Sequence, residues 1–588
     1  MVEPRFRWHF PAAAGPLEVV PIAVSELGIS ARLAALLAAR GVVTRDEQVA
    51  WFGDPLAGLH DPARLPDADR LLARLRTARD RDERVMVFGD FDADGLTGLA
   101  IMTLALRRFG LVVDPYVPSR LDEGHGLSLA AVEAAVASGA GLIITVDCGT
   151  SSIAEVAAAN ARGIDVIVTD HHRVAAVLPD AIAVVNPHRP DAAYPDRRLT
   201  GSGVAFKIAQ LLLADEPGGP AAALDLADLA TIGSVADVAP IVGENRAIAR
   251  LGLDRLRNAT RPGIAALLER ARIAPAAVDL ETIAFAIAPR LNAAGRVGEA
   301  VEAAHLLLAD DAATAATHAD ALEAANLTRR DLMKVAVAEA RAAVAEDGGA
   351  AATVVRGPWS VGIVGLVAAR LVEDRGRPAV VGADLGDVVR ASCRSDGSLD
   401  LGAALETCAD LFTRFGGHSG AAGFELPVGN WEPFRERFLL LTAETAPPDP
   451  RVSIVIDVAL PAIEVDYALY RELAGLSPCG PGNPDPLVAV LGLTVTRVRA
   501  AAGGHSQLTL RRERDVLDGI AFGRSDIAET VHVGDRLDVV ARLTSRRFGG
   551  FESLQLDIRD VATSGSHPGS AALLGAAGSG PLLAASVS

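Results

Sequence analysis

Three short apolar runs each end in acidic or imidazole side chains, and sequence with helical spacing separates them. Continuous apolar runs that alternate with helices are typical of a parallel sheet buried on both faces. The pattern therefore predicts an α/β fold for the first part of the chain. The three runs cover residues 85–88, 141–146 and 166–169.

The titratable groups at these run ends should lie close together, because the carboxyl ends of parallel strands meet along one edge of a sheet. Carboxylates at such distances repel one another, and a divalent cation removes that conflict. Oxygen ligands with an imidazole suit manganese, magnesium or a similar ion rather than zinc held by thiolates. Taken singly, each acid could instead cap a helix or close a loop turn. The groups are Asp90, Asp92 and Asp94, then Asp147, then Asp170, His171 and His172.

A chain of 588 residues is too long for one hydrophobic core, so several domains are expected. Half of the residues are apolar and 22% are charged, a balance typical of a folded chain. Proline and glycine runs and shifts in composition divide the sequence. The expected parts are a helical segment joined to the first lobe (1–75), an α/β lobe (76–260), a helical connector (261–347), a second α/β lobe (348–447), an antiparallel β-barrel (448–563) and a disordered tail (564–588).

The formal net charge of −18 by itself points away from a protein that binds polyanions, but a local basic groove outweighs such a sum. Lysine occurs only at Lys207 and Lys334, so nearly all positive charge is arginine, whose planar fork suits bidentate phosphate contacts. The four cysteines lie far apart without paired spacing, which fits a reducing cytoplasm. No stretch is long and apolar enough for a membrane span, so we expect a cytoplasmic protein with no membrane partner.

Short motifs follow the strand ends in a fixed order: VFGDFDADG (87–95), TVDCG (145–149), DHH (170–172) and GSVAD (233–237). Others lie downstream: PRLNAAGR (289–296), RASCRS (390–395) and GGHSGAAG (416–423). Together they resemble the motifs of the DHH phosphoesterase superfamily and, within it, the RecJ family. The resemblance extends from Trp8 to about Val561. It implies a DHH parallel-sheet lobe, a long helical connector, a DHH-associated α/β lobe and a C-terminal OB-type β-barrel.

The resemblance also implies two divalent metal ions, with manganese favoured and magnesium as the alternative. One ion would be held by Asp92 and Asp147, with Asp90 as a further candidate. Asp147 would bridge the two ions. Such a pair activates water for in-line displacement at a phosphodiester. The ligands implied for the second ion are Asp94, Asp147, His171 and Asp237.

Catalytic roles are implied for Asp147, His172 and Arg290. Two roles stay open for His172, which either orients a metal ligand or donates to a phosphate oxygen, whereas Asp170 is expected to be structural. Arg290 and His418 would contact phosphates near the metals, and three other residues would hold the 5′-terminal phosphate. The alternative for each arginine is a surface salt bridge, and for the glycines a tight turn. The full implied substrate-binding set is Arg120, Ser392, Arg394, Gly417, His418 and Arg296, of which the first three hold the terminal phosphate.

Three residues depart from the family pattern. His125 and Phe91 stand where tyrosine is usual, and Ala391 stands where glycine commonly precedes Ser392. We expect neither His125 nor Ala391 to touch a metal ligand, and we expect activity to be kept.

The implied function is a metal-dependent 5′→3′ exonuclease that hydrolyses single-stranded DNA to 5′-mononucleotides in DNA repair and recombination, by two-metal activation of water. The implied partners are single-stranded-DNA-binding protein and a RecQ-type helicase, and we expect a monomer. Two alternatives stay open. One is a DHH nanoRNase or cyclic-dinucleotide phosphodiesterase, which the barrel and the leading helices disfavour. The other is a catalytically silent DNA-binding scaffold, which the presence of all the implied ligands disfavours.

Overall fold

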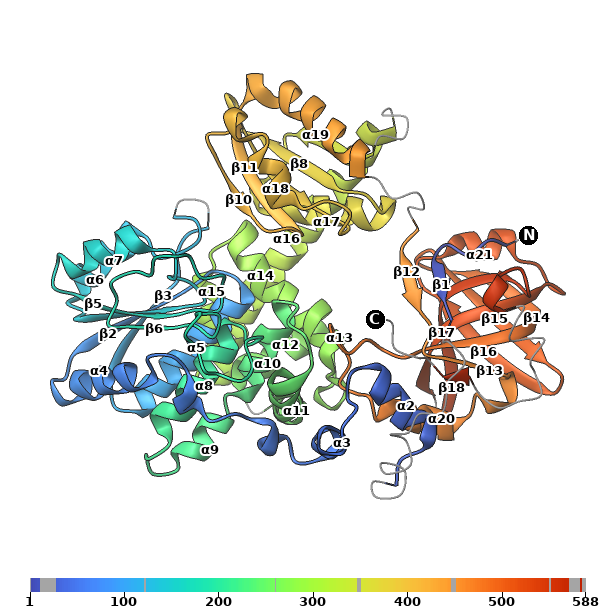
Figure 1. Cartoon of the computed structure of the whole chain (residues 1–588), viewed down its shortest axis with the longest axis horizontal. Coiled ribbons are helices and arrows are strands. Elements are labelled where there is room, and N and C mark those ends of the chain that lie inside the picture. Colours follow the sequence, from blue (N-terminus) through green and yellow to red (C-terminus); the bar gives the residue numbers. More distant parts are fainter. Residues whose placement is uncertain are drawn as a thin grey trace. The chain divides into compact units, whose positions relative to one another are not determined.

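The computed structural model describes residues 2–10, 28–120, 123–259, 261–345, 351–445, 451–548, 551–570 and 582–583. The chain divides into two compact units, and Figure 1 labels most of their helices and strands. Gly58–Pro450 form the larger unit, and Met1–Ala57 together with Arg451–Ser588 form the barrel unit. Within the described residues, no helix combines the length and the apolar character needed to cross a membrane.

A five-stranded sheet is the centre of the first lobe of the larger unit. All of its strand pairings are parallel. Successive residues of each strand contribute to two separate cores, one on each face of the sheet, as the continuous apolar runs predict. The strand order across the sheet is β3 (Val112–Tyr116), β2 (Arg84–Gly89), β4 (Leu142–Val146), β5 (Asp165–Thr169) and β6 (Ala183–Val185).

Helices cover both faces of this sheet (Figure 1). The smaller core lies against α6 (Leu129–Ser138) and α7 (Ile153–Asn160). The larger core lies against the opposite face and includes α4 (Ala68–Asp80), α5 (Ala93–Arg108) and α8 (Gly201–Leu213). It also takes in α9 (Gly219–Leu224), α10 (Ala227–Ala236), α11 (Gly243–Asn258), α12 (Pro262–Ala271) and α13 (Leu280–Thr282).

One long helix joins the cores of two lobes. It is α16 (Ala312–Ala345), whose 34 residues extend for about 51 Å at 1.5 Å per residue. Ala315, Ala319 and Leu322 near its start belong to the first lobe's core, whereas Ala336 to Val344 near its end pack in the second lobe. The shorter helices before it are α14 (Ala288–Val297) and α15 (Val301–Leu307).

The second lobe is built on a mixed five-stranded sheet. Only the β7–β8 pairing is parallel. Its helices are α17 (Val361–Arg375), α18 (Leu401–Glu406) and α19 (Trp431–Thr445), with α17 packed on one face and α18 and α19 on the other. The strand order is β10 (Arg414–Gly417), β11 (Ala421–Pro427), β9 (Val388–Arg394), β8 (Ala379–Asp384) and β7 (Thr353–Gly357).

Five strands of the barrel unit close on themselves: β14 (Leu487–Ala501), β15 (His505–Arg512), β16 (Asp515–Ala521), β18 (Phe551–Thr563) and β17 (Arg536–Phe548). The pairing of β14 with β15 completes the barrel, and within it only β16 and β18 pair in parallel. The predicted α/β lobes and C-terminal OB-type barrel are thus confirmed. The remaining elements of the unit are β1 (Arg7–His9), β12 (Ser453–Val455), β13 (Val458–Leu460), β19 (Leu582–Leu583), α2 (Ala31–Ala39), α3 (Arg45–Phe52), α20 (Tyr467–Ala474) and α21 (Ser525–Thr530).

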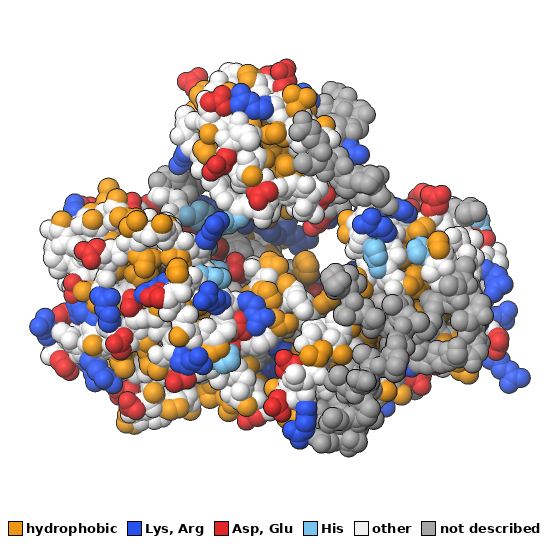
Figure 2. Space-filling view, in the orientation of Figure 1, with side chains coloured by type: hydrophobic (Ala, Val, Ile, Leu, Met, Phe, Trp, Pro, Cys, Tyr) orange, Lys and Arg blue, Asp and Glu red, His pale blue; other side chains and the backbone are white. Residues whose placement is uncertain are grey.

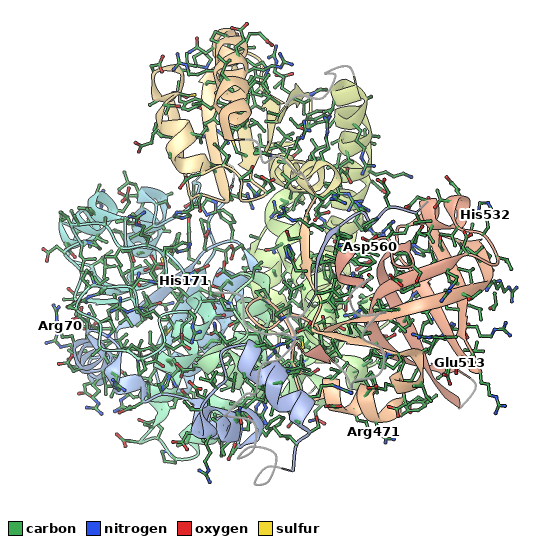
Figure 3. The ribbon with its side chains drawn as sticks, turned by 45° about the vertical axis from the view of Figure 1, so that its right-hand side comes forward. Arg70, His171, Arg471, Glu513, His532 and Asp560 are labelled. Atoms are coloured by element: carbon green, nitrogen blue, oxygen red, sulfur yellow. The ribbon has the colours of Figure 1, made fainter. Side chains whose placement is uncertain are left out.

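Most of the N-terminal segment belongs to the barrel unit, whereas we expected residues 1–75 to join the first lobe. Leu37 of α2 and Trp51 of α3 share a core with barrel strands, and the expected boundary at 75/76 falls inside α4. The buried carboxylate of Asp560, labelled in Figure 3, accepts a hydrogen bond of 2.8 Å from the indole of Trp8 in β1. Helical periodicity shows which face of a helix is buried but not which partner covers it.

Several expected boundaries cannot be compared with the structure. Those at 347/348 and 447/448 lie outside the described residues, as does most of the tail at 564–588. The described part of that tail comprises residues 564–570 and β19, which pairs with β13.

Leu37→Ala tests the assignment of α2 to the barrel. Leu37 is fully buried, so the change should lower the free energy of unfolding by about 2–5 kcal/mol. Amide hydrogen exchange should accelerate in β14 and β17 and stay unchanged in β4. Val43→Ala is the matched control, because Val43 is exposed and its loss should cost less than about 0.5 kcal/mol. Faster exchange in β4 alone would contradict the assignment.

Candidate active site

Three acids lie in the turn from β2 into α5. Asp92 is the N-cap of α5, and its Oδ1 accepts hydrogen bonds of 3.0 Å from the backbone N–H groups of Asp94 and Gly95. Asp90 is buried, and its Oδ1 accepts from the backbone N–H of Phe91 at 2.8 Å. The capping role considered for a single acid therefore applies to Asp92, and it leaves the other oxygen of this carboxylate for further contacts.

The start of α8 holds the buried carboxylate of Asp94. The backbone N–H groups of Gly201 and Ser202 donate to it at 2.7 and 3.1 Å, and the hydroxyl of Thr200 donates at 2.9 Å. A helix N-terminus favours negative charge through its free N–H groups and its dipole. A Cβ at Gly233 would lie 2.4 Å from Oδ1 of Asp94, so only glycine allows α10 this close. Sequence reasoning missed Thr200 and Ser202, because a Thr-Gly-Ser-Gly run is also typical of an ordinary helix start.

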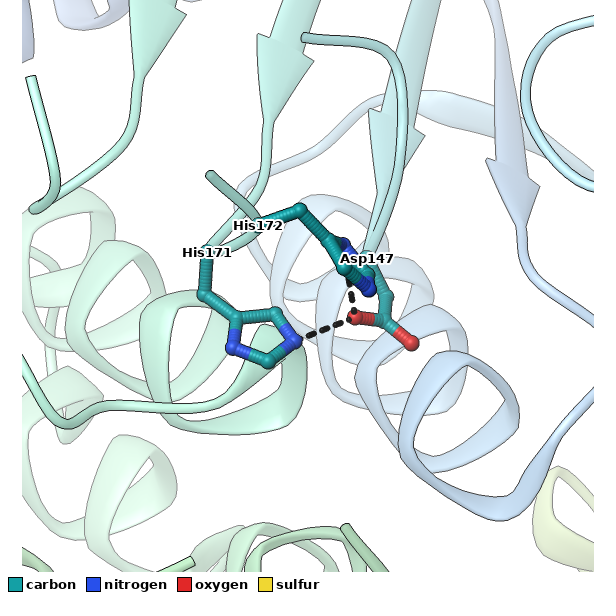
Figure 4. A group of neighbouring side chains, drawn as sticks. All are labelled: Asp147, His171 and His172. Atoms are coloured by element: carbon teal, nitrogen blue, oxygen red, sulfur yellow. Dashed lines mark ion pairs between the residues drawn. The ribbon is translucent and has the colours of Figure 1, made fainter. Parts of the chain in front are cut away.

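Asp147 follows β4 in a strained backbone conformation. Its φ of 64° lies in the left-handed region, which costs a non-glycine residue of order 1–3 kcal/mol. Its Oδ1 is buried without a hydrogen-bond donor, although Nε2 of His171 lies 3.0 Å away and Nδ1 of His172 lies 4.0 Å away (Figure 4). Burial and the nearby Asp94 and Asp92 raise the pKa of Asp147 well above its usual range. A cation between these groups would satisfy both the orphaned oxygen and the crowded charge.

Asp170 serves as an internal anchor for the two histidines that follow it. Its Oδ1 accepts from the backbone N–H groups of His171 and His172 and lies 2.8 Å from Nδ1 of His172, while its Oδ2 accepts from the backbone N–H of Thr150. Burial alone would raise the pKa of Asp170, but these hydrogen bonds leave it lowered. The hydrogen bond with Asp170 raises the pKa of His172 to about 9, against the opposing effect of burial.

His171 stands at the centre of three carboxylates. Its Nε2 lies 3.0 Å from Asp147, 3.9 Å from Asp94 and 3.9 Å from Asp237, which is the C-cap of α10. Burial, followed by the charges of Asp94 and Asp92, raises the pKa of Asp237 to about 8. Burial lowers the pKa of His171, so its neutral form is favoured, which is the form that binds metals.

Potential ligand atoms fall into groups that fit divalent ions. Asp90, Asp92 and Asp147 form one group, and Asp94, His171 and Asp237 form another. Burial together with Asp90 and Asp94 raises the pKa of Asp92 to about 6, so the cluster resists full ionisation by itself. Carboxylate oxygens with one imidazole suit manganese or magnesium. The structure thus brings together all six acids and imidazoles considered as ligands: Asp90, Asp92, Asp94, Asp147, His171 and Asp237.

A cleft of about 860 Å³ opens over this cluster, and residues from both lobes of the larger unit line it. Figure 2 shows basic side chains, for which arginine and lysine share one colour, and histidine side chains along the hollow between these lobes. From the first lobe come Asp90, Arg120, His125, Asp147, Asp170 and His172, and from the second come Ser392, Arg394, Gly416, Gly417 and His418.

The cleft includes five of the seven residues expected to contact substrate and leaves out Arg290 and Arg296. Arg290 donates from Nε to Glu323 of α16 at 2.6 Å. Arg296 donates to the backbone oxygen of Gly362 at 3.0 Å, and burial together with Arg120 and other arginines lowers its pKa to about 9. Arg290 thus forms a salt bridge, although its side chain is largely covered and does not lie on the surface as that alternative assumed.

His125 contacts a candidate metal ligand, whereas we expected it to touch none. Its Nδ1 lies 3.0 Å from Oδ2 of Asp90, and its ring centroid lies 4.4 Å from that of Phe91. The guanidinium of Arg120 also lies over the ring of Phe91, 4.9 Å from the ring centroid. The loop before α6 folds back onto the acidic turn, a tertiary contact that local sequence does not reveal.

Asp170→Asn tests how the anchor sets the charge of His172. Its hydrogen bond favours the protonated imidazole, so the change should lower the pKa of His172 from about 9 towards the ordinary value of about 6.5. NMR titration of the metal-free protein measures this pKa. Asp180→Asn, on the exposed loop of the same lobe, should leave it unchanged. An unaltered titration of His172 in Asp170→Asn would refute the assignment.

Three family models match the chain. The DHH family, N-terminal domain, matches residues 84–234, the DHHA1 domain matches 347–443 and the RecJ OB domain matches 456–560. The first of these contains β2 to β6, and the last contains most of the closed barrel.

Curated relatives and solved structures agree with these matches. The single-stranded-DNA-specific exonuclease RecJ of Bacillus subtilis (strain 168) is 33% identical over 96% of this chain and 72% of its own length. That of Salmonella typhimurium is 35% identical over 90% of this chain and 95% of its own length. The crystal structure of RecJ with Mn²⁺ from Thermus thermophilus superposes with a TM-score of 0.81 at 30% identity, covering 95% of this chain and 80% of that one. The chain has the three matched domains, and these relatives are 33–35% identical to it over most of their length. It therefore belongs to the RecJ family.

Proposed function

We propose that this chain is a divalent-metal-dependent exonuclease that degrades single-stranded DNA from its 5′ end and releases 5′-mononucleotides. The observation that carries the proposal is the meeting of the acids with His171 beneath a cleft whose second wall bears Ser392 and Arg394. The names of its relatives, single-stranded-DNA-specific exonucleases, support the substrate and the reaction class.

In this proposal Asp147 would be shared between two metal positions. Asp90 and Asp92 complete the first set, and Asp94, His171 and Asp237 complete the second. Bound divalent ions supply an activated water and neutralise charge on the phosphate. Structures of the Thermus relative with Mn²⁺ and with Mg²⁺ support a divalent ion, and we favour two manganese ions.

His172 would act on the phosphate in its charged form. Its side chain is half exposed and lines the cleft, and a pKa of about 9 keeps the imidazole protonated at neutral pH. Asp170 occupies Nδ1, which leaves Nε2 to donate to a phosphate oxygen. Of the two roles considered, orienting a metal ligand and donating to a phosphate oxygen, we favour donation, because the ring lines the cleft with its Nδ1 already held by Asp170.

Both walls of the cleft would hold the end of the strand. Arg120, Ser392 and Arg394 come from different lobes and line the same space, so a terminal phosphate there would be held from two sides. Burial lowers the pKa values of Arg120 and Arg394, so the two guanidinium groups are poorly hydrated and would gain from a phosphate partner. Gly417 and His418 would face the phosphates that follow.

The alternatives have less support. A DHH enzyme that cleaves only short or cyclic nucleotides does not account for the RecJ OB domain at residues 456–560. A silent scaffold does not account for intact ligand residues whose side chains converge. A role in DNA repair and recombination, a cytoplasmic location, a monomeric state and partners such as single-stranded-DNA-binding protein and a RecQ-type helicase follow from the family resemblance and belong to the same proposal.

Strands labelled at one end test the direction and the role of Asp147 together. With manganese present, the wild-type chain should release label from the 5′ end of single strands and leave blunt duplex intact. Asp147→Asn should slow release more than about 100-fold, beyond the 10- to 100-fold that loss of an outer-shell partner costs. Asp180→Asn should keep the wild-type rate. Degradation mainly from the 3′ end, or equal cutting of blunt duplex, would disprove the proposal.

Arg394→Ala tests the contact with the terminal phosphate. A hydrogen bond to a charged group contributes about 1.5–3 kcal/mol, so kcat/KM on strands with a 5′-phosphate should fall roughly 10- to 150-fold. Strands with a 5′-hydroxyl should be much less affected. Arg370→Ala, an exposed arginine of the same lobe paired with Glu373, is the control. Equal losses on both kinds of strand would place Arg394 elsewhere on the substrate.

A further inference from the structure

A second group of metal-ligating side chains lies outside the cleft, where α15 turns back into α16. Glu302 and His305 are three residues apart on α15, so both point to the same side of that helix. His318 lies in the second turn of α16. None of the three lines the cleft or belongs to the acidic cluster described above.

The three side chains are close enough to share one ion. Nδ1 of His318 lies 2.7 Å from Oε2 of Glu302, and the ring centroids of His305 and His318 are 5.2 Å apart. Each residue offers a ligand atom, and these atoms all lie within 4.8 Å of one another. A tetrahedral ion with bonds of about 2.0–2.2 Å needs ligand atoms roughly 3.3–3.6 Å apart, so small side-chain rotations suffice.

The backbone beneath this group is fixed by packing. Ala303, Ala304 and Leu306 on α15 are buried in the core of the first lobe, as are Ala315 and Ala319 on α16. The ligand-bearing sides of both helices face away from that core, with His305 exposed and Glu302 and His318 partly exposed. An ion can therefore reach the group without any rearrangement of the helices.

The chemistry of the three ligands favours a borderline transition metal. Two imidazoles and one carboxylate are a ligand set used for zinc, with a fourth position open to water. The acidic cluster in the cleft is different, because it offers mostly carboxylates and suits harder ions. The hydrogen bond between Glu302 and His318 already places two of the three ligands, and zinc would take the position of the shared proton.

We propose that Glu302, His305 and His318 bind one Zn²⁺ ion and thereby link α15 to α16. This site is independent of the cleft and of the proposed nuclease reaction. Because α16 continues into the core of the second lobe, the ion would stabilise the start of the helix that both lobes share.

Equilibrium dialysis of the full chain against Zn²⁺, followed by elemental analysis, tests the site. The assay compares wild type with a His305→Ala/His318→Ala variant, each with and without Asp147→Ala. His532→Ala, an exposed histidine in the barrel unit, is the matched control. Circular dichroism verifies that each variant is folded.

The double histidine variant should bind one zinc ion fewer per chain in both backgrounds, and His532→Ala should bind as many as wild type. In the Asp147→Ala background, the rise in melting temperature on adding zinc should be smaller in the double histidine variant than in the chain that keeps both histidines. Unchanged stoichiometry in the double variant would overturn the site, whatever happens to nuclease activity.

Glu302→Gln keeps the test valid if the double variant folds poorly. The amide preserves the shape and a hydrogen bond with His318 but removes the charge that an ion requires, so zinc affinity should fall at least about tenfold. His305→Ala alone changes only an exposed side chain and should have a similar effect. Zinc affinity equal to wild type in both single variants would show that the ion binds elsewhere.

Discussion

Repulsion among closely spaced carboxylates is the constraint on which the first lobe depends. Asp92, Asp94, Asp147 and Asp237 meet in one small volume, and burial together with mutual charge raises the pKa values of Asp92, Asp147 and Asp237. Without cations, such a group keeps protons that its members would lose in water. Metal binding would relieve this repulsion. Without a bound ion, the surrounding fold has to compensate for the unfavourable energy of the crowded carboxylates.

The fold meets that cost with backbone dipoles and close packing. Asp94 receives two N–H groups from the start of α8, and Asp92 receives two from the start of α5. Glycine at the start of α8 lets this helix approach Asp147, since a Cβ at Gly201 would lie 2.4 Å from Cβ of Asp147. Asp170 performs a separate task, because its hydrogen bonds orient both histidines instead of contributing a metal ligand.

Much of this arrangement could be predicted from sequence because parallel strands place their carboxyl ends together. Asp90, Asp147 and His171 follow strands that apolar runs reveal, so their meeting follows from topology. Asp237 follows a helix, and only the family resemblance indicated it. The contact of His125 with Asp90 and the packing of α2 on the barrel stayed hidden, because periodicity and local motifs do not report which distant segment covers a surface. Arg290 was expected to contact phosphates near the metals, and sequence did not reveal that its Nε donates to Glu323.

The backbone at Asp147 has a consequence for how this chain can change. Glycine would adopt the left-handed conformation there without strain and would remove a buried carboxylate, so that replacement should raise the free energy of unfolding while removing a proposed metal ligand. Selection for stability and selection for catalysis thus act in opposite directions on this one residue. In a relative without catalytic activity, replacing this aspartate with glycine would carry no cost to stability.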